Sequence, residues 1–236
     1  MLDFLQNPDT YLSLFTLTVL EIILGIDNIL FISIICANLP KDQQELARKL
    51  GLSLALFGRL GLLFSLSWLL SLKNPILIFL DHTFSIHDII LGSGGLFLFY
   101  KATQELINVT KTELPNHHKR LISFNFAIFQ IFMLDIVFSL DSIITAIGLT
   151  AQLTIMAIAI LIAVIIMVFA ARYVSGFLEK NPSMKVLGLA FLLLISIFLL
   201  ADAFGEHIPR GYVYFALGFS IFVEFVNIQN KHKNKI

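Results

Sequence analysis

Two apolar stretches of the sequence carry the same pair of carboxylates. Glu21 and Asp27 lie six residues apart in the first stretch, and Asp135 and Asp141 have the same spacing in the second. Both stretches are long enough to cross a bilayer, where one charged side chain costs about 2.5 to 3.5 kcal/mol on insertion scales. Four such side chains in apolar surroundings predict a pathway or binding site for a cation or a proton.

A small polar residue follows the second acid of each pair, which makes the candidate ligands all oxygen donors. Hard oxygen donors suit Mg²⁺, Ca²⁺ and Mn²⁺ better than soft metals. We therefore predict a metal-ion site formed by six residues: Glu21, Asp27, Asn28, Asp135, Asp141 and Ser142. Asp27 and Asp141 are the favoured direct ligands, because Asn28 and Ser142 place a further side-chain oxygen beside each of them.

The six-residue spacing has a structural consequence. On a straight helix, two such side chains point about 120° apart and lie roughly 9 Å apart along the axis, so they cannot face one ion. Either each helix is interrupted between its acids, at the equivalent residues Gly25 and Ser139, or the two acids of a pair have different tasks. An interruption would free backbone carbonyls for a cation.

Structural ion pairing is the alternative role for the acids. Arg59, Arg172 and Lys101 also lie in apolar stretches and could neutralise three of the four carboxylates. Buried ion pairs of this kind do occur as packing devices. The sequence favours the cation pathway and leaves open whether Glu224, near the end of the last apolar stretch, snorkels to the surface or lines an exit path.

Composition identifies a polytopic membrane protein. Of the 236 residues, 58% are apolar and 14% charged, and the mean hydropathy is +0.89, whereas soluble domains are about 45–50% apolar and about 25% charged. The net charge of zero gives no attraction to nucleic acid. The single cysteine, Cys36, excludes an intrachain disulfide.

Apolar runs of about 20 residues predict an all-α fold of seven transmembrane helices in a single domain. The expected spans are Tyr11–Cys36, Leu50–Leu72, His87–Leu106, Ile122–Leu149, Leu153–Gly176, Met184–Ala201 and Gly211–Ile228. The segment before the first span lacks the basic region of a signal peptide, so that span is expected to be retained. Pro75–Leu80 is apolar but too short to cross, and is expected to lie in the interface or re-enter.

Basic residues in the loops and at the span ends predict the orientation. With the N-terminus outside, eleven of them are cytoplasmic and two, Lys73 and Arg210, are external. The cytoplasmic set is Lys41, Arg48, Lys49, Lys111, Lys119, Arg120, Lys180, Lys185, Lys231, Lys233 and Lys235. The positive-inside rule therefore predicts an external N-terminus and a cytoplasmic C-terminus.

The acidic pairs are 114 residues apart and indicate an internal repeat. Arg59 follows Asp27 by 32 residues and Arg172 follows Asp141 by 31, while Leu91-Gly92 resembles Leu187-Gly188. The predicted copies are residues 11–106 and 122–201, with an extra helix over 211–228. Three spans per copy place the copies in opposite orientations, as in secondary transporters with a midplane substrate site.

A cation transporter is the function that these features favour. An intramembrane aspartyl protease would also use two aspartates on different spans, but its Gly-x-Gly-Asp pattern is absent around Asp27 and Asp141. A retinal receptor would need a lysine in the last span, which instead carries Glu224. No enzymatic activity, resident cofactor or nucleic-acid partner is expected. The expected partners are the transported ion and the lipid bilayer.

The two acidic motifs, residues 20–28 and 134–142, resemble those of the TerC family of bacterial membrane proteins, and residues 209–216 resemble its short members without appended soluble domains. The resemblance implies a seven-helix fold related to the LysE transporter superfamily, in the bacterial inner membrane. It also implies metal-ion homeostasis, with manganese export as the leading role and tellurite or other metal-stress resistance as an alternative. The family's acids correspond here to Glu21, Asp27, Asp135 and Asp141.

Overall fold

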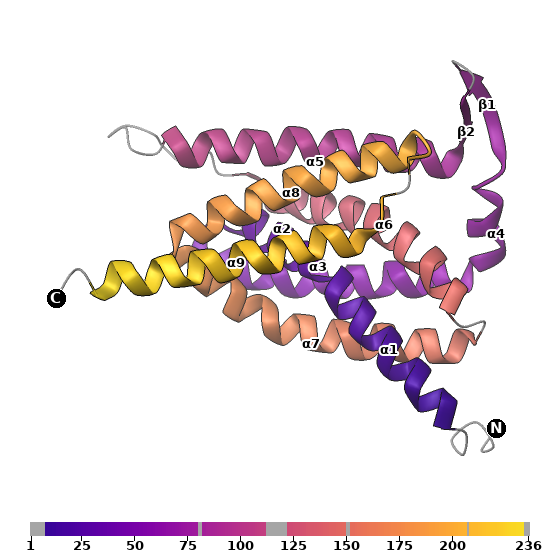
Figure 1. The fold of residues 1–236 in the computed structure, drawn as a ribbon, viewed down its shortest axis with the longest axis horizontal. Helices are drawn as coiled ribbons and strands as arrows, with labels where there is room; N and C mark the ends of the chain where they lie inside the picture. The colour runs from indigo at the N-terminus through magenta and orange to yellow at the C-terminus, as the bar shows by residue number, and fades with distance from the viewer. Residues whose placement is uncertain (1–7, 80–81, 112–121, 150–151, 207, 234–236) are drawn as a thin grey trace. The chain divides into compact units, whose positions relative to one another are not determined.

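A computed structural model describes residues 8–79, 82–111, 122–149, 152–206 and 208–233 (Figure 1). These residues form helices joined by short loops, together with one hairpin. The helices are α1 (Pro8–Leu24), α2 (Ile26–Cys36), α3 (Lys41–Phe64), α4 (Leu66–Ser71), α5 (Ile86–Lys111), α6 (Phe124–Leu149), α7 (Leu153–Lys180), α8 (Pro182–Ala203) and α9 (Arg210–Lys233). The strands are β1 (Pro75–Phe79) and β2 (His82–Ser85).

Helices occupy all seven stretches that the sequence predicts as spans. The first stretch contains α1 and α2, the second contains α3 and α4, and each of the other five contains one helix. Helix α3 begins at Lys41 rather than Leu50, because its first turns form a solvated helix in which Lys49 bonds to Glu45 at 2.9 Å. The helical fold class is therefore confirmed, while crossing of a membrane by all seven remains a prediction.

Length and composition alone mark three described helical stretches as membrane-crossing. They are Thr10–Cys36, Leu153–Lys180 and Pro182–Ala203. Two shorter apolar helical stretches, Phe124–Leu140 and Gly211–Asn227, accompany them. The protein is thus an all-α membrane protein apart from its hairpin.

The segment Pro75–Leu80 contributes to a hairpin. Residues 75–79 form β1, which pairs with β2 in a two-stranded sheet, while its expected place in or near the membrane interface remains a prediction. The segment is too short to span a bilayer as a helix, and pairing satisfies backbone groups that an apolar coil would leave exposed. Phe84 of β2 packs edge-on against Phe204, with 5.7 Å between ring centroids.

The chain divides into two compact units. The first comprises Met1–Pro75, Ser85–His87 and Lys119–Ser175, and the second comprises Ile76–Phe84, Asp88–His118 and Gly176–Ile236. The first unit therefore contains α1 to α4, α6 and most of α7. The second contains α5, α8 and α9.

Two contacts at different positions along a pair of helices show whether the helices are parallel or antiparallel. Helix α2 is antiparallel to α6, because Asn28 bonds to Asp135 and the carbonyl of Asn38 accepts a bond from the Ile122 amide. Helix α7 runs in the same direction as α1 and α2. Its Met167 lies against Gly25, and its Ser175 hydroxyl donates to Ser33 at 2.8 Å.

Helices α3 and α6 lie close together in this unit. A Cβ atom on Gly51 would lie 2.9 Å from Ile131, and one on Gly58 would lie 3.3 Å from Phe132. These glycines allow the close approach that puts Arg59, the next residue of α3, beside α6.

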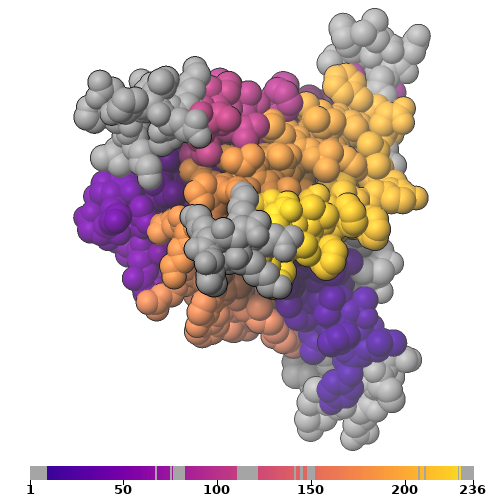
Figure 2. All heavy atoms as spheres, turned by 60° about the vertical axis from the view of Figure 1, so that its left-hand side comes forward, coloured from indigo at the N-terminus to yellow at the C-terminus, as the bar shows by residue number. Residues whose placement is uncertain are grey.

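The second unit is built around the antiparallel pair α5 and α8. A Cβ atom on Gly92 would lie 3.3 Å from Ala203, and Lys185 at the other end of α8 bonds to Glu105 at 2.9 Å. Helix α9 buries Val213 and Leu217. Helix α9 lies at the surface in Figure 2, in yellow. Most of its exposed side chains are aromatic or aliphatic.

A short interruption separates α1 from α2 at Gly25, as one of the two alternatives for the acidic spacing requires. The Gly25 amide donates to the carbonyls of Glu21 and Ile22 at 2.9 and 3.1 Å, and its own carbonyl accepts from Ile29. The chain therefore tightens and bends at Gly25 without releasing these carbonyls. No interruption occurs at Ser139, which lies inside the continuous helix α6.

Gly25 has no room for a larger side chain, because a Cβ atom there would collide with the sulfur of the buried Met167. We predict that Gly25→Ala lowers the stability of the detergent-solubilised protein by about 1–3 kcal/mol through overpacking. Thermal unfolding checks this value.

Two further variants separate overpacking from a general effect of alanine. Gly218→Ala on α9, where a Cβ atom would meet open space, should be neutral or stabilising. In a Met167→Ala background, Gly25→Ala should no longer destabilise. A Gly25→Ala protein as stable as the wild type would show that the collision with Met167 is not a real constraint.

A buried charge cluster as candidate functional site

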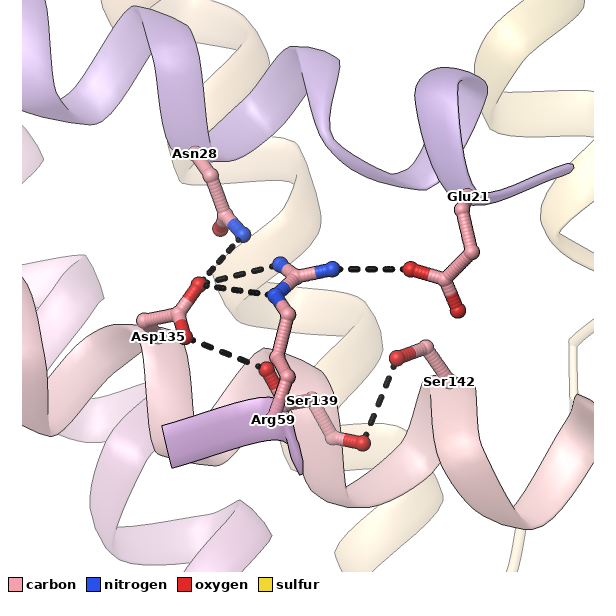
Figure 3. Close-up of polar contacts among 6 residues, drawn as sticks. All are labelled: Glu21, Asn28, Arg59, Asp135, Ser139 and Ser142. Carbon is pink, nitrogen blue, oxygen red and sulfur yellow. Dashed lines mark hydrogen bonds and ion pairs between the residues drawn. The ribbon is translucent and has the colours of Figure 1, made fainter. Parts of the chain in front are cut away.

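A single arginine joins two of the predicted acidic residues. The Arg59 guanidinium lies between the carboxylates of Glu21 and Asp135, as Figure 3 shows. Its Nη1 donates to Glu21 Oε2 at 2.8 Å, and its Nη2 donates to Asp135 Oδ1 at 2.9 Å. All three side chains are almost completely buried, with exposures of 2–3%. The helices α1, α3 and α6 each supply one member of this triad.

Asp135 receives more hydrogen bonds than an isolated ion pair would provide. Its Oδ1 also accepts from Arg59 Nε at 3.3 Å and from the Asn28 amide nitrogen at 2.8 Å. Its Oδ2 accepts from the Ser139 hydroxyl at 3.3 Å. Such a set of donors holds the ionised carboxylate in place and compensates for its removal from water.

The sequence explains why Asn28 and Ser139 reach Asp135. Ser139 is one helical turn after Asp135 on α6, so both side chains lie on the same face. Asn28 is in the first turn of α2, just beyond the bend at Gly25, and the antiparallel packing of α2 on α6 brings it to Asp135. The Ser142 hydroxyl instead donates to the Ser139 carbonyl at 3.2 Å.

The other two predicted ligands are Asp27 and Asp141. Asp27 is buried, with 4% exposure, in the first turn of α2. The backbone of Asp141 belongs to α6, but its side chain lies outside the described part of the structure. Among the side chains that are described, no group of three acidic, histidine or cysteine residues is arranged to hold a metal.

The Arg59 contacts bear on the two explanations of the acidic spacing. Glu21 and Asp135 occupy equivalent positions in the two motifs, and both bind Arg59. A division of tasks within each pair therefore fits the geometry, whereas a symmetric break in both helices does not, because α6 is continuous at Ser139.

Three basic residues were predicted as charge partners of the acids. Arg59 pairs with Glu21 and Asp135. Arg172 is exposed on α7, within three turns of its Lys180 end, where a long side chain can snorkel to water. Its charge, after the hydrogen bond and charge of Lys49, helps to lower the pKa of the exposed Glu45. The expectation that Arg172 neutralises a buried acid is therefore wrong.

Lys101 is the third predicted charge partner. It lies on α5 in the second unit, is partly buried, and has Glu105 one turn further along the same helix as a neighbouring charge. The four acids all belong to helices of the first unit.

Several buried polar residues of the first unit were not singled out from the sequence, among them Ser33, Ser175 and Gln130. Ser33 and Ser175 bond to each other across α2 and α7, and Gln130 of α6 is 1% exposed. No described atom bonds to the Gln130 amide nitrogen. The only sequence feature that could have identified them was a polar residue within a predicted span. Polar residues in spans also occur at surface positions, so this feature alone does not identify buried ones.

The buried charges do not balance. The buried carboxylates in the described chain are Glu21, Asp27 and Asp135, and the buried guanidinium is that of Arg59. Three negative charges against one positive charge leave an excess of two negative charges when all are ionised. Burial of an ionised carboxylate in apolar surroundings is costly unless other groups stabilise it.

The fold and this cluster define an integral membrane protein whose apolar interior contains a few buried charges. The chain belongs to the integral membrane protein TerC family, whose characteristic sequence matches residues 6–235. This family and the names of its relatives identify a multi-pass protein of the bacterial inner membrane.

Several curated relatives match most of the chain. The UPF0053 inner membrane protein YgdQ of Escherichia coli K12 is 47% identical over 232 residues, which cover 98% of each chain. A UPF0053 protein of Haemophilus influenzae is 44% identical over the full length of both. The Escherichia coli inner membrane protein YoaE is 45% identical, but the match covers 96% of this chain and only 44% of that protein. No solved structure is significantly similar to the chain.

The ion pairs predict a large effect of removing the Arg59 charge. Arg59→Gln leaves Glu21 and Asp135 buried without their shared partner and should lower stability by about 3–5 kcal/mol. The measurement is thermal or denaturant unfolding in detergent.

Two variants serve as controls. Lys185→Gln removes the partly exposed pair with Glu105 and should cost about 1 kcal/mol or less. Glu21→Gln combined with Arg59→Gln should recover part of the lost stability. Equal losses for Arg59→Gln and Lys185→Gln would contradict the assigned importance of burial.

Proposed function

We propose that the protein is a membrane transporter of divalent metal ions and that its main substrate is manganese, which it exports. The observation that carries this proposal is the excess of buried carboxylates over buried cations in the first unit. When all three carboxylates are ionised, a bound divalent ion would balance the two excess negative charges, and two bound protons would remove them. Alternation between these two states would exchange a metal ion for protons.

The chemistry of the available side chains supports a hard cation. Asp27 and Asp141 are the proposed direct ligands, with side-chain oxygens of Asn28 and Ser142 beside them. The Asn28 bond to Asp135 uses the amide nitrogen, so the amide oxygen can serve a cation. Carboxylate, amide and hydroxyl oxygens suit Mn²⁺ as well as Ca²⁺, whereas Mg²⁺ more often retains its water ligands. The choice of manganese follows the resemblance to the family.

We infer that all seven helical stretches span the membrane, with the N-terminus outside and the C-terminus in the cytoplasm. The helix directions support this topology, because α6 is antiparallel to α2, and α7 is parallel to α1 and α2. The antiparallel pair α5 and α8 agrees with it as well. An alternating topology requires these directions for the first, third, fourth, fifth and sixth spans.

The division into units supports an inverted repeat. The first two helical stretches of each proposed copy belong to the first unit, and the third helix of each copy, α5 or α8, belongs to the second. Gly92 is the seventh residue of α5 and Gly188 is the seventh residue of α8. Equivalent parts of the two copies are thus used in equivalent ways, as inverted-repeat transporters require.

A proteolytic function has less support. An aspartyl dyad needs two carboxylates that share a proton. Asp135 instead accepts bonds from an arginine, an amide and a hydroxyl. A resistance function toward tellurite or another metal differs from manganese export in substrate and is distinguished by the same experiment.

The test is the metal content of cells grown under manganese stress, with and without the protein. We expect cells with the wild-type protein to contain several-fold less manganese than cells without it, and cells with Asp27→Asn or Asp141→Asn to resemble those without it. Asp42→Asn, which changes an exposed acid in the first turn of α3, is the matched control and should behave as the wild type. Membrane levels of each variant are compared by immunoblot.

Two results would count against this function. Normal manganese export by Asp27→Asn and Asp141→Asn would show that these two residues are not required as ligands. Unchanged manganese together with altered levels of another metal would redirect the substrate.

A further inference from the structure

The Arg59 guanidinium occupies a place that has the features of a cation site. Carboxylates from α1 and α6 converge on it, and its contacts to Glu21 and Asp135 are 2.8 and 2.9 Å long. Asn28 and Ser139 complete the polar surroundings of Asp135. Figure 3 shows the guanidinium in the centre of this group, entering from α3.

We propose that Arg59 is a tethered cation that excludes the transported ion from the Glu21–Asp135 pair. This inference rests on the proposed function and adds a specificity-determining residue to it. Arginine suits the role because its guanidinium remains charged and can bridge two carboxylates with separate N–H groups. With Arg59 in place, a metal ion is confined to the oxygens on the Asp27 side.

The physical reason for such a residue is the risk of trapping the substrate. Two buried carboxylates without a counter-charge would attract a divalent ion strongly, since charges interact far more strongly in an apolar interior than in water. Transport requires an ion to leave as well as to enter, so a second deep site would retain it. A tethered charge neutralises these carboxylates and cannot be carried away.

The burial of Glu21, Arg59 and Asp135 determines what should happen when the arginine charge is removed. Arg59, Glu21 and Asp135 are each exposed by 2–3%, so water cannot replace the guanidinium as a screen for the two carboxylates. The partly exposed pair formed by Lys185 and Glu105 has side-chain exposures of 22% and 14% and offers solvent screening. Removal of Arg59 is therefore expected to recruit an ion, whereas removal of Lys185 is not.

The test is the number of Mn²⁺ ions that bind to the purified full-length chain in detergent. Equilibrium dialysis at low micromolar Mn²⁺, followed by elemental analysis, gives this number. Arg59→Gln is expected to bind one more Mn²⁺ per chain than the wild type. Arg59→Lys and Lys185→Gln should bind the same number as the wild type, and Arg59→Gln with Asp135→Asn should lose the additional ion.

Because Arg59→Gln is expected to be less stable than the wild type, a second measurement tests the proposal through its unfolding temperature. Mn²⁺ should raise the unfolding temperature of Arg59→Gln more than that of the wild type, because the ion would replace the missing charge between the carboxylates. Recovery of Arg59→Gln only when Mn²⁺ is present during purification would support the proposal. Failure to recover it with or without Mn²⁺ would overturn it.

The outcomes separate this inference from the proposed function. If the wild type binds and transports Mn²⁺ but Arg59→Gln binds no additional ion, the tethered-cation role is wrong and the transport function stands. If the wild type neither binds nor transports a divalent ion, the proposed function fails, and the role of Arg59 as an occupant that excludes substrate fails with it.

Discussion

The structure depends on how charge is tolerated inside an apolar helical protein. Arg59 and its two carboxylates are the clearest case, because none of the three could be buried alone at acceptable cost. The close packing of α3 on α6 at Gly51 and Gly58, and the bend between α1 and α2 at Gly25, bring the three groups together. The backbone of the first unit is thus shaped around one set of ion pairs.

The same constraint separates the acids by task. Glu21 and Asp135 are bound by a residue of the protein itself, whereas Asp27 lies beyond the bend, in the first turn of the next helix. A six-residue spacing on one helix would otherwise be an awkward way to place two ligands on one ion. It becomes understandable when the first acid of each motif pairs with Arg59 and the second acid has a different task.

The sequence predicted the helices well because long apolar runs leave few alternatives. It also predicted Arg59 as a charge partner, since a charge in the middle of such a run needs one. It could not predict which acids Arg59 would bind. That pairing depends on how each helix is oriented about its axis and on which helices pack against one another. For the same reason Arg172, which matched Arg59 by spacing, proved to be exposed, and Pro75–Phe79 formed a strand whose partner no local pattern specified.

The asymmetry of the cluster has a consequence for direction. In a transporter built from inverted repeats, exchange of the conformations of the two copies interconverts the inward-facing and outward-facing states. Identical copies would make these states equal in energy. Here the helix is interrupted at Gly25 in the first motif and continuous at Ser139 in the second, and the buried Arg59 lies in the first of the two predicted copies. Such a carrier would rest preferentially on one side of the membrane, with no regulatory ligand required to set that preference.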